Sequence, residues 1–393
     1  MTEIKKENKN MSNVPNLRFP GFEGEWEVRK LGEVCKMQAG KFVSASEINI
    51  ISNSNLFPCY GGNGLRGYTK SFNQHGKYSL IGRQGALCGN VTLVNGKFHA
   101  TEHAIVVTPD INIDTDWMFY LLTYLNLNQF ATGMAQPGLS VQNLEKVEVI
   151  IPKSKAEQQK KGAFLSLIDK RIQTQSKIIE ELKILKATLA HDIYSQQLRF
   201  HDKNNKDFCD WKVIKLGTVM SIPEKIKPKE IEKEKLLTVK LHMKGVLKNV
   251  NTESLSIGST SYYLRKKGQF IYGKQNLFNG AFAIIPDKFD GFLSSSDVPS
   301  LEIDKTKLNN VFLFNFFGRE KFYRKLEDIA SGSGSKRIHE ETLLKVKIQL
   351  PCLEEQTKIA NLLSQIDEKI EIEKQLLIQY ENQKKYLLQN LFI

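Results

Sequence analysis

The segment HATEH brings together side chains that could bind a metal ion. His99 and His103 lie four positions apart around Glu102, a spacing that could suit a metal ion. The segment follows NGKF and is predicted to be a strand or a loop, where residues four apart do not converge as they do on a helix. No third ligand is evident in the sequence. We therefore expect no metal site, and we expect core or hydrogen-bonding roles for both histidines.

Sequence motifs of catalysis are missing. The chain has no G-x-x-x-x-G-K-[ST] loop for nucleotide phosphates, no N-P-P-[YF] or D-P-P-[YF] motif of an amino-methyltransferase, and no compact P-D…[DE]-x-K nuclease cluster. The sequence therefore predicts a non-catalytic protein that needs no cofactor of its own.

Side chains suited to reading DNA gather in a glycine-rich stretch, residues 58–91, that interleaves basic and aromatic residues. Glycine permits close backbone approach to a ligand, and Arg, Asn and Gln are the side chains that read base edges. We predict that DNA is contacted here by some of Asn63, Arg66, Arg83 and Gln84. The alternative is that the aromatic residues, spaced two apart, form the core of a strand.

The second half of the chain offers a different basic surface. Residues 212–248 contain ten lysines and four glutamates, a surplus that is typical of an electrostatic DNA footprint but also of a solvated surface. YGKQN parallels the earlier IGRQG, and SGSGSKRIH parallels the loop GMAQPGLS, residues 133–140. The candidates for DNA contact are Lys240, Lys244, Lys274, Gln275, Lys336 and Arg337. The alternatives for the last four are a turn cap and a plain linker.

The candidate DNA contacts lie within an internal repeat of the sequence. WEVRKLGEV recurs as WKVIKLGTV, LEKVEVIIP as LLKVKIQLP, the dipeptide EQ recurs 198 positions later, and FLSLIDKRI recurs as LLSQIDEKI. Each half therefore contains a variable body, a strand that ends in proline, and a long helix. A period near 190 residues indicates a duplicated domain pair rather than a solenoid.

The two long helices carry apolar residues in alternating steps of three and four, which is the pattern of a coiled-coil seam. Each seam is interrupted by polar residues at equivalent places, Gln175 with Glu373 and Lys186 with Lys384. We predict that the helices pair antiparallel within one chain; alternatively, each packs on its own half or seals a homodimer. The predicted seam residues are Leu165, Ile168, Ile172, Ile179, Leu182, Leu363, Ile366, Ile370, Leu377 and Tyr380.

Composition is compatible with a DNA-binding protein of the cytoplasm. The net charge of +13 favours an anionic partner, with nucleic acid first and a membrane surface second. The five cysteines are scattered and odd in number, so we expect no disulfide framework and a reducing compartment. No apolar run reaches about 18 residues, the length that a membrane span needs.

These features together resemble the specificity subunit of type I restriction-modification enzymes. The resemblance covers nearly the whole chain and rests on LRFPGFEGEWEVRKLGEV, on YGGNGLRGY with IGRQGALCG, and on the repeated proline, EQ and I-D-x-[RK]-I signature. It implies an α+β fold in which two globular α/β target-recognition domains are joined and held apart by two long helices. These helices would form an antiparallel coiled coil, with internal pseudo-twofold symmetry.

The boundaries that we expect are a flexible tail at 1–16, recognition domains at 17–152 and 201–351, and spacer helices at 153–200 and 352–393. The resemblance implies that the partners of the chain are double-stranded DNA, two methylation subunits docked on the spacer, and restriction subunits that join through the methylation subunits. It implies no membrane partner. S-adenosylmethionine, ATP and Mg are then expected in the partner subunits. Because YGGNGLRGY has no clean counterpart in the second half, we expect an asymmetric bipartite target.

Two other classes remain open. A basic two-domain RNA-binding protein would share the charge and the aromatic residues, and would prefer RNA or single strands. A coiled-coil scaffold without DNA specificity would account for the helices alone.

Overall fold

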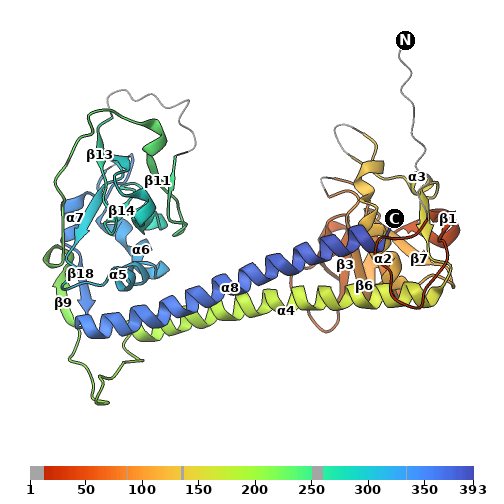
Figure 1. The fold of residues 1–393 in the computed structure, drawn as a ribbon, viewed down its shortest axis with the longest axis horizontal. Helices are drawn as coiled ribbons and strands as arrows, with labels where there is room; N and C mark the ends of the chain where they lie inside the picture. Colours follow the sequence, from red (N-terminus) through yellow and green to blue (C-terminus); the bar gives the residue numbers. More distant parts are fainter. Residues whose placement is uncertain (1–12, 86, 134–136, 250–259, 333) are drawn as a thin grey trace, which may run out of the picture. The chain divides into compact units, whose positions relative to one another are not determined.

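The protein has mixed α/β content and divides into two compact units (Figure 1). The computed structural model describes residues 13–85, 87–133, 137–249, 260–332 and 334–393. Unit 1 comprises Met1–Lys177 and Lys374–Ile393, and unit 2 comprises Ile178–Glu373. Each unit therefore combines one globular body with part of both long helices. Within the described ranges, no helix has the length and apolar character to cross a membrane.

A six-stranded sheet with the order β2-β7-β5-β6-β3-β4 forms the body of unit 1. Neighbouring strands are antiparallel except for the parallel pair β3 and β6. Helix α2 (Thr115–Tyr124) contributes Trp117 and Leu121 to the core, and Asp114 caps it by accepting from Trp117 N at 2.9 Å. The strands are β2 Cys35–Ala39, β3 Phe57–Gly61, β4 Gly64–Thr69, β5 Gln74–Gly82, β6 Val91–Ala100 and β7 Ala104–Pro109.

The two ends of this body are joined before the long helix begins. Strand β1 (Glu27–Lys30) pairs antiparallel with β8 (Glu148–Ile151), so the chain leaves the body beside its point of entry. The remaining short elements are helices α1 (Leu31–Val34) and α3 (Val141–Leu144), with 3-10 turns at Ala45–Glu47 and Leu127–Phe130.

Unit 2 repeats the same frame, which is a terminal strand pair that leads into a long helix, around a different body. Strand β9 (Lys212–Lys215) pairs antiparallel with β18 (Lys347–Leu350), as β1 does with β8. The body holds a four-stranded sheet, β10-β17-β14-β15, and two-stranded sheets β11-β12 and β13-β16. Its strands are β10 Met220–Ser221, β11 Leu237–Val239, β12 Val246–Lys248, β13 Tyr262–Leu264, β14 Phe270–Tyr272, β15 Phe282–Ile284, β16 Leu293–Ser295 and β17 Ser300–Ile303. Its helices are α5 Asn310–Phe317, α6 Glu320–Lys325 and α7 Glu340–Leu344.

The two predicted long helices are present as α4 (Lys155–Tyr194) and α8 (Leu353–Leu391), of 40 and 39 residues. Neither contains proline, which would remove a backbone donor and break the helix. Gly162 serves packing, because a Cβ there would lie 2.8 Å from the backbone nitrogen of Trp117 in α2. All ten predicted seam residues are buried or half-buried.

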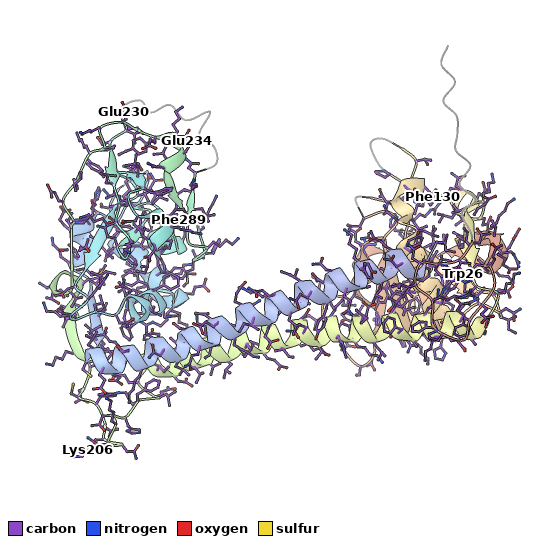
Figure 2. All side chains as sticks on the ribbon, viewed as in Figure 1. Trp26, Phe130, Lys206, Glu230, Glu234 and Phe289 are labelled. Carbon is purple, nitrogen blue, oxygen red and sulfur yellow. The ribbon has the colours of Figure 1, made fainter. Side chains whose placement is uncertain are left out.

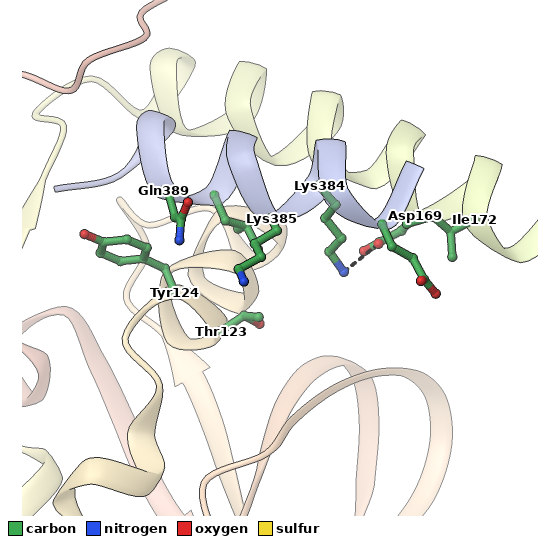
Figure 3. A pocket seen from close by; sticks show the side chains of 9 residues that line it. Thr123, Tyr124, Asp169, Ile172, Lys384, Lys385 and Gln389 are labelled. Atoms are coloured by element: carbon green, nitrogen blue, oxygen red, sulfur yellow. Dashed lines mark ion pairs between the residues drawn. The ribbon is translucent and has the colours of Figure 1, made fainter. Parts of the chain in front are cut away.

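In unit 1, the beginning of α4 lies beside the end of α8. Lys384 forms an ion pair with Asp169 at 2.6 Å (Figure 3), and Lys161 Nζ donates to the carbonyl oxygen of Leu391 at 2.8 Å. Leu165 of α4 shares a buried cluster with Leu387 of α8. Residue numbers fall along α8 as they rise along α4, so the two segments run antiparallel here.

Unit 2 contains the reciprocal contact between the other helix segments. Lys186 of α4 forms an ion pair with Asp367 of α8 at 2.6 Å, and Ile193 of α4 shares a buried cluster with Leu363 of α8. The two lysines that interrupt the predicted seam are thus paired with the two aspartates of the repeated I-D-x-[RK]-I signature. Within each unit, a signature aspartate of one helix pairs with a seam lysine of the other.

The repeated EQ dipeptide ties each body to its helix. In unit 1, the Glu157 side chain is 1% exposed and forms an ion pair with Arg18 at 2.8 Å. It also accepts from the indole Nε1 of Trp26 at 3.3 Å; Trp26 is labelled in Figure 2. In unit 2, Glu355 accepts from Arg199 Nε at 2.9 Å and from Trp211 Nε1 at 3.1 Å. A carboxylate in the first helical turn is also favoured by the helix dipole.

The glutamine of each dipeptide completes the connection. Gln158 accepts from the backbone nitrogen of Asp114 at 2.9 Å and donates to the carbonyl oxygen of Pro152 at 3.1 Å. Gln356 accepts from Asn309 N at 2.8 Å and donates to Pro351 O at 2.9 Å. Asp114 and Asn309 cap α2 and α5, so each glutamine joins a strand end, a body helix and a long helix. Buried amides require such partners.

The frames differ at one buried position, where Lys161 in unit 1 takes the place of Ile359 in unit 2. The side chain of Lys161 is fully buried, and its ammonium lies 4.0 Å from the ring centroid of Trp26. Burial lowers the pKa of Lys161 to about 8, although Glu157 acts in the opposite direction.

This buried lysine predicts a pH-dependent stability for the protein. Between pH about 8 and the ordinary lysine value of 10.5, the unfolded chain binds a proton that the folded chain lacks. The contribution of Lys161 to the free energy of unfolding should therefore rise with pH through this window, by up to about 3 kcal/mol. Urea unfolding of the wild type and Lys161→Met should show a difference that changes with pH. Lys160→Met, at an exposed neighbour, is the control; a pH-independent difference for Lys161→Met would contradict the assignment.

Candidate nucleic-acid interface

The glycine-rich stretch of unit 1 folds into a hairpin whose tip lies against the end of β5. Gly61 pairs with Gly64, so Gly62 and Asn63 form a two-residue turn, and Gly64 has a φ of +86°, which suits glycine. A Cβ on Gly82, at the end of β5, would collide with the carbonyl oxygen of Gly62. The glycines therefore allow the hairpin tip to reach the residues that follow β5.

A hollow of about 460 Å³ lies at this meeting point. It brings together three of the four predicted DNA contacts in this body, Asn63, Arg66 and Gln84. All three are exposed. The complete lining is Gly61, Gly62, Asn63, Gly64, Leu65, Arg66, Gln84, Gly85 and His103. An amide pair and a guanidinium around an open hollow can donate to and accept from base edges.

Arg83, the fourth predicted contact, does not line the hollow. Its side chain is half-buried, and its backbone holds the site together: Arg83 N donates to His103 O at 2.9 Å and Arg83 O accepts from Leu139 N at 2.9 Å. The loop that contains Leu139 is GMAQPGLS, of which residues 134–136 lie outside the described residues.

His103 is a lining residue that the sequence analysis did not propose as a DNA contact. Its Nδ1 lies 3.0 Å from Gln84 Oε1, and its Nε2 lies 3.2 Å from Glu102 Oε1. His99 lies apart, buried, with Nε2 near Lys41 O at 3.1 Å. In the part of the chain that the structure describes, no three metal-binding side chains come together. A hydrogen-bonding role was expected for His103 from the sequence, but its partner Gln84 was not, because the two residues lie 19 positions apart.

Unit 2 builds an equivalent meeting point from Lys274 and Gln275. Ile338 N donates to Lys274 O at 3.0 Å, just as Leu139 N donates to Arg83 O in unit 1. With its oxygen turned toward Arg337, the Gln275 amide accepts from guanidinium Nη2 at 2.9 Å. The two parallels drawn from the sequence, between the basic-Gln pairs and between the loops, thus correspond to one repeated backbone contact.

The side chains of the predicted DNA contacts at this point of unit 2 differ in their exposure to solvent. Lys274 is buried, and its ammonium lies 2.9 Å from Glu340. This contact favours the structural alternative for Lys274 over a DNA contact. Gln275 and Lys336 are exposed, although Lys336 pairs with Glu327 at 2.7 Å, and Arg337 is half-buried beside Asp297 at 3.5 Å.

Lys240 and Lys244 lie in the connection between β11 and β12, and both are exposed. The loop is held by backbone bonds from His242 N to Asn279 O at 3.0 Å and from Met243 N to Gly280 O at 2.8 Å. His242 and Met243 both have φ of 57°, an unusual backbone for non-glycine residues that these bonds maintain. The lysines are thus carried on an anchored loop and remain open to solvent.

A second hollow of unit 1, of about 650 Å³, lies between α2 and the helix pair (Figure 3). Thr123 and Tyr124 of α2 line one side, and Lys385 and Gln389 of α8 the other. Its lining also includes Glu381 and the ion pair of Lys384 with Asp169, so charges of both signs meet there. This mixed lining does not match the donor-rich surface that DNA phosphates require.

Comparisons with known proteins agree with the repeat. The family model described as the type I restriction modification DNA specificity domain matches residues 23–184 and 209–382. The specificity subunit of the type I restriction enzyme EcoprrI of Escherichia coli is 41% identical over 179 residues, which cover 45% of this chain and 43% of that protein. The match thus spans less than half of that relative. A putative type I restriction enzyme specificity subunit of Haemophilus influenzae, S.HindORF215P, is 23% identical over 359 residues, or 88% of each chain.

Two solved structures share the fold. The S subunit of a type I restriction-modification system from M. genitalium has a TM-score of 0.64 at 16% identity, over 97% of this chain and 99% of that one. A structure described as the basis of complex assembly and conformational transition of a type I system has a TM-score of 0.53 at 14% identity, over 93% and 97%.

The buried contact of Lys274 generates a stability prediction. Burial raises the pKa of Glu340, but the hydrogen bond from Lys274, a backbone hydrogen bond and the charges of Lys274 and Lys225 together outweigh it and leave the pKa below its ordinary value of 4.5. Lys274→Ala should lower the free energy of unfolding by about 2 kcal/mol at neutral pH, since the buried carboxylate of Glu340 then keeps the longer contact with exposed Lys225, at 3.8 Å, in place of a close hydrogen-bonded pair. The loss should shrink in acid as Glu340 takes up a proton, and Glu340→Gln in the same chain should offset part of it. Lys240→Ala is the exposed control; equal effects of both lysine substitutions would refute the assignment.

Proposed function

The chain belongs to the family of type I restriction modification DNA specificity domains, and from this premise we propose that it reads an asymmetric bipartite DNA target. Unit 1 would read one half-site and unit 2 the other. The observation that carries the proposal is the repeated meeting point: one backbone contact positions a basic-Gln pair in both units, but different side chains surround it.

In unit 1, the reading surface that we propose is the hollow with Asn63, Arg66 and Gln84. Among the residues that the structure describes, the side chains of Asn63 and Arg66 have no hydrogen-bond or ion-pair partner, so their donors are available to a duplex. Burying such groups against base edges provides discrimination, because a wrong base leaves them unpaired.

In unit 2, the proposed surface includes Gln275 and Lys336 together with the anchored loop of Lys240 and Lys244. Exposed lysines contact phosphates, which positions a protein on DNA without reading its sequence. Gln275 beside Arg337 would supply the base-reading contact. The different bodies of the two units would give different half-sites.

We further propose that α4 and α8 form one continuous antiparallel coiled coil that acts as spacer between recognition domains at 17–152 and 201–351. The reciprocal ion pairs, Lys384 with Asp169 and Lys186 with Asp367, support this arrangement. Two linked readers bind as one ligand, because docking of the first raises the effective concentration of the second.

Methylation subunits are the partners that we propose for the spacer, with restriction subunits joining through them. S-adenosylmethionine, ATP and Mg would belong to those partners. Both long helices expose large apolar side chains outside the seam, which suits a protein partner. These exposed residues are Leu167, Ile184, Leu185, Ile372, Ile378 and Tyr386.

Methylation mapping tests the two-reader proposal. The chain, purified with its methylation subunits, should methylate a random DNA library at two defined half-sequences separated by one gap. Arg66→Ala should relax only one half-sequence, and Lys244→Ala should weaken binding without relaxing either, because a phosphate contact carries no sequence information. A target without two parts would sink the proposal, as would relaxation of both halves by Arg66→Ala.

A matched insertion tests the spacer. Seven extra residues after Lys177 in α4 and seven after Gln375 in α8 keep both ion pairs within their own units. An added heptad lengthens a helix by about 10 Å, or about three base pairs of duplex. Methylated DNA should show a gap longer by about this amount and unchanged half-sequences. The control is the same insertion in α4 alone, which mismatches the seam; an unchanged gap in the matched variant would exclude a spacer role.

A further inference from the structure

Gln84 reaches the hollow of unit 1 as the end of a three-residue chain of contacts. The carboxylate of Glu102 lies 3.2 Å from His103 Nε2, and His103 Nδ1 lies 3.0 Å from Gln84 Oε1. Both His103 and Gln84 line the hollow. The imidazole therefore bridges a carboxylate and the amide that faces the space where a ligand would lie.

The backbone around this chain of contacts is fixed. Arg83 N donates to His103 O at 2.9 Å, Gly82 pairs with Ala104 in the β5-β7 ladder, and Gly85 N donates to Pro137 O at 3.2 Å. The Gln84 backbone therefore has little freedom to move. What remains to be set is which end of its amide, oxygen or nitrogen, points into the hollow.

Hydrogen-bond chemistry sets that choice through His103. The ring nitrogen Nε2 lies beside the Glu102 carboxylate, 3.2 Å from its Oε1. An amide oxygen only accepts, so in the 3.0 Å contact of Gln84 Oε1 with Nδ1 the ring nitrogen is the donor. With its oxygen turned toward His103, the Gln84 amide is left with its nitrogen for the hollow.

We propose that His103, held by Glu102, is a positioning residue that makes Gln84 present its amide nitrogen to DNA. The hollow then offers donors, from Gln84 and from the guanidinium of Arg66, to a base edge that carries acceptors. In the major groove this edge belongs above all to guanine, with N7 and O6, whereas the amino groups of adenine and cytosine would face another donor. This inference rests on the proposed function and adds which kind of base unit 1 selects at this position.

Two substitutions of His103 that are isosteric with each other separate the possible orientations. His103→Asn can place its amide donor near the position of Nδ1 and should retain the wild-type preference. His103→Asp places an acceptor there, which should turn the Gln84 nitrogen toward position 103 and its oxygen toward DNA. The preferred base should then shift at one position of one half-site toward adenine or cytosine, whose amino groups donate. Because the His103 side chain is 44% exposed, both variants should fold, which thermal melting checks.

The experiment is methylation of a random library by the protein in complex with its methylation subunits, with wild type, His103→Asn, His103→Asp and Gln84→Ala compared. We expect about a tenfold loss of discrimination at a single position in His103→Asp and Gln84→Ala, and none in His103→Asn. The half-site read by unit 2 is the internal control and should not change.

The outcomes distinguish this inference from the proposed function. A wild-type protein without a bipartite target would refute the proposed function, and this inference with it. Relaxation at one position by Gln84→Ala, with an unchanged preference in folded His103→Asp, would overturn only the role of His103. Gln84→Ala identifies the position of the half-site that Gln84 reads. If the wild type prefers adenine or cytosine at that position, the predicted orientation of the amide would be wrong.

Discussion

The architecture depends on a buried carboxylate at the first turn of each long helix. Glu157 and Glu355 are at most 1% exposed, and each accepts from an arginine and from a tryptophan indole. Burying a charge without partners would cost several kcal/mol, so these contacts tolerate little rearrangement. The adjacent glutamines Gln158 and Gln356 add directional bonds to a strand end and a body helix. The connection between body and helix is therefore specified by polar geometry as well as by apolar burial.

A frame held in this way allows the two bodies to differ. The same terminal strand pairs, β1 with β8 and β9 with β18, enclose a six-stranded sheet in one unit and a four-stranded sheet with two small sheets in the other. The contact of Leu139 with Arg83 recurs as that of Ile338 with Lys274. A recognition surface can change around such a fixed contact because the residues that maintain the fold lie elsewhere.

Much of this organisation could be predicted from sequence, because repeated phrases and heptad spacing are local signals. The mixed α/β fold, the two long helices and the family were predicted correctly. The lysines Lys186 and Lys384 were identified as interruptions of the seam, and Asp169 and Asp367 as parts of a repeated phrase. The pairing of these lysines with these aspartates across the two helices was not predicted, since it joins residues that are 181 and 215 (384 − 169) positions apart. The paired LRF segments that contain Arg18 and Arg199 were a visible signal that went unused.

The amino-acid sequence alone determined the duplication, the positions of the helices and the basic, amide-rich character of the candidate surfaces. These follow from composition and periodicity, which need no knowledge of distant neighbours. Only the tertiary structure decided which polar side chains remain exposed and free to contact a ligand. Lys274 is withdrawn into a pair with Glu340, whereas Arg66 stays open and His103 comes to lie against Gln84. Burial and hydrogen-bond partners depend on contacts between separate strands and loops, and such contacts exist only in the folded chain.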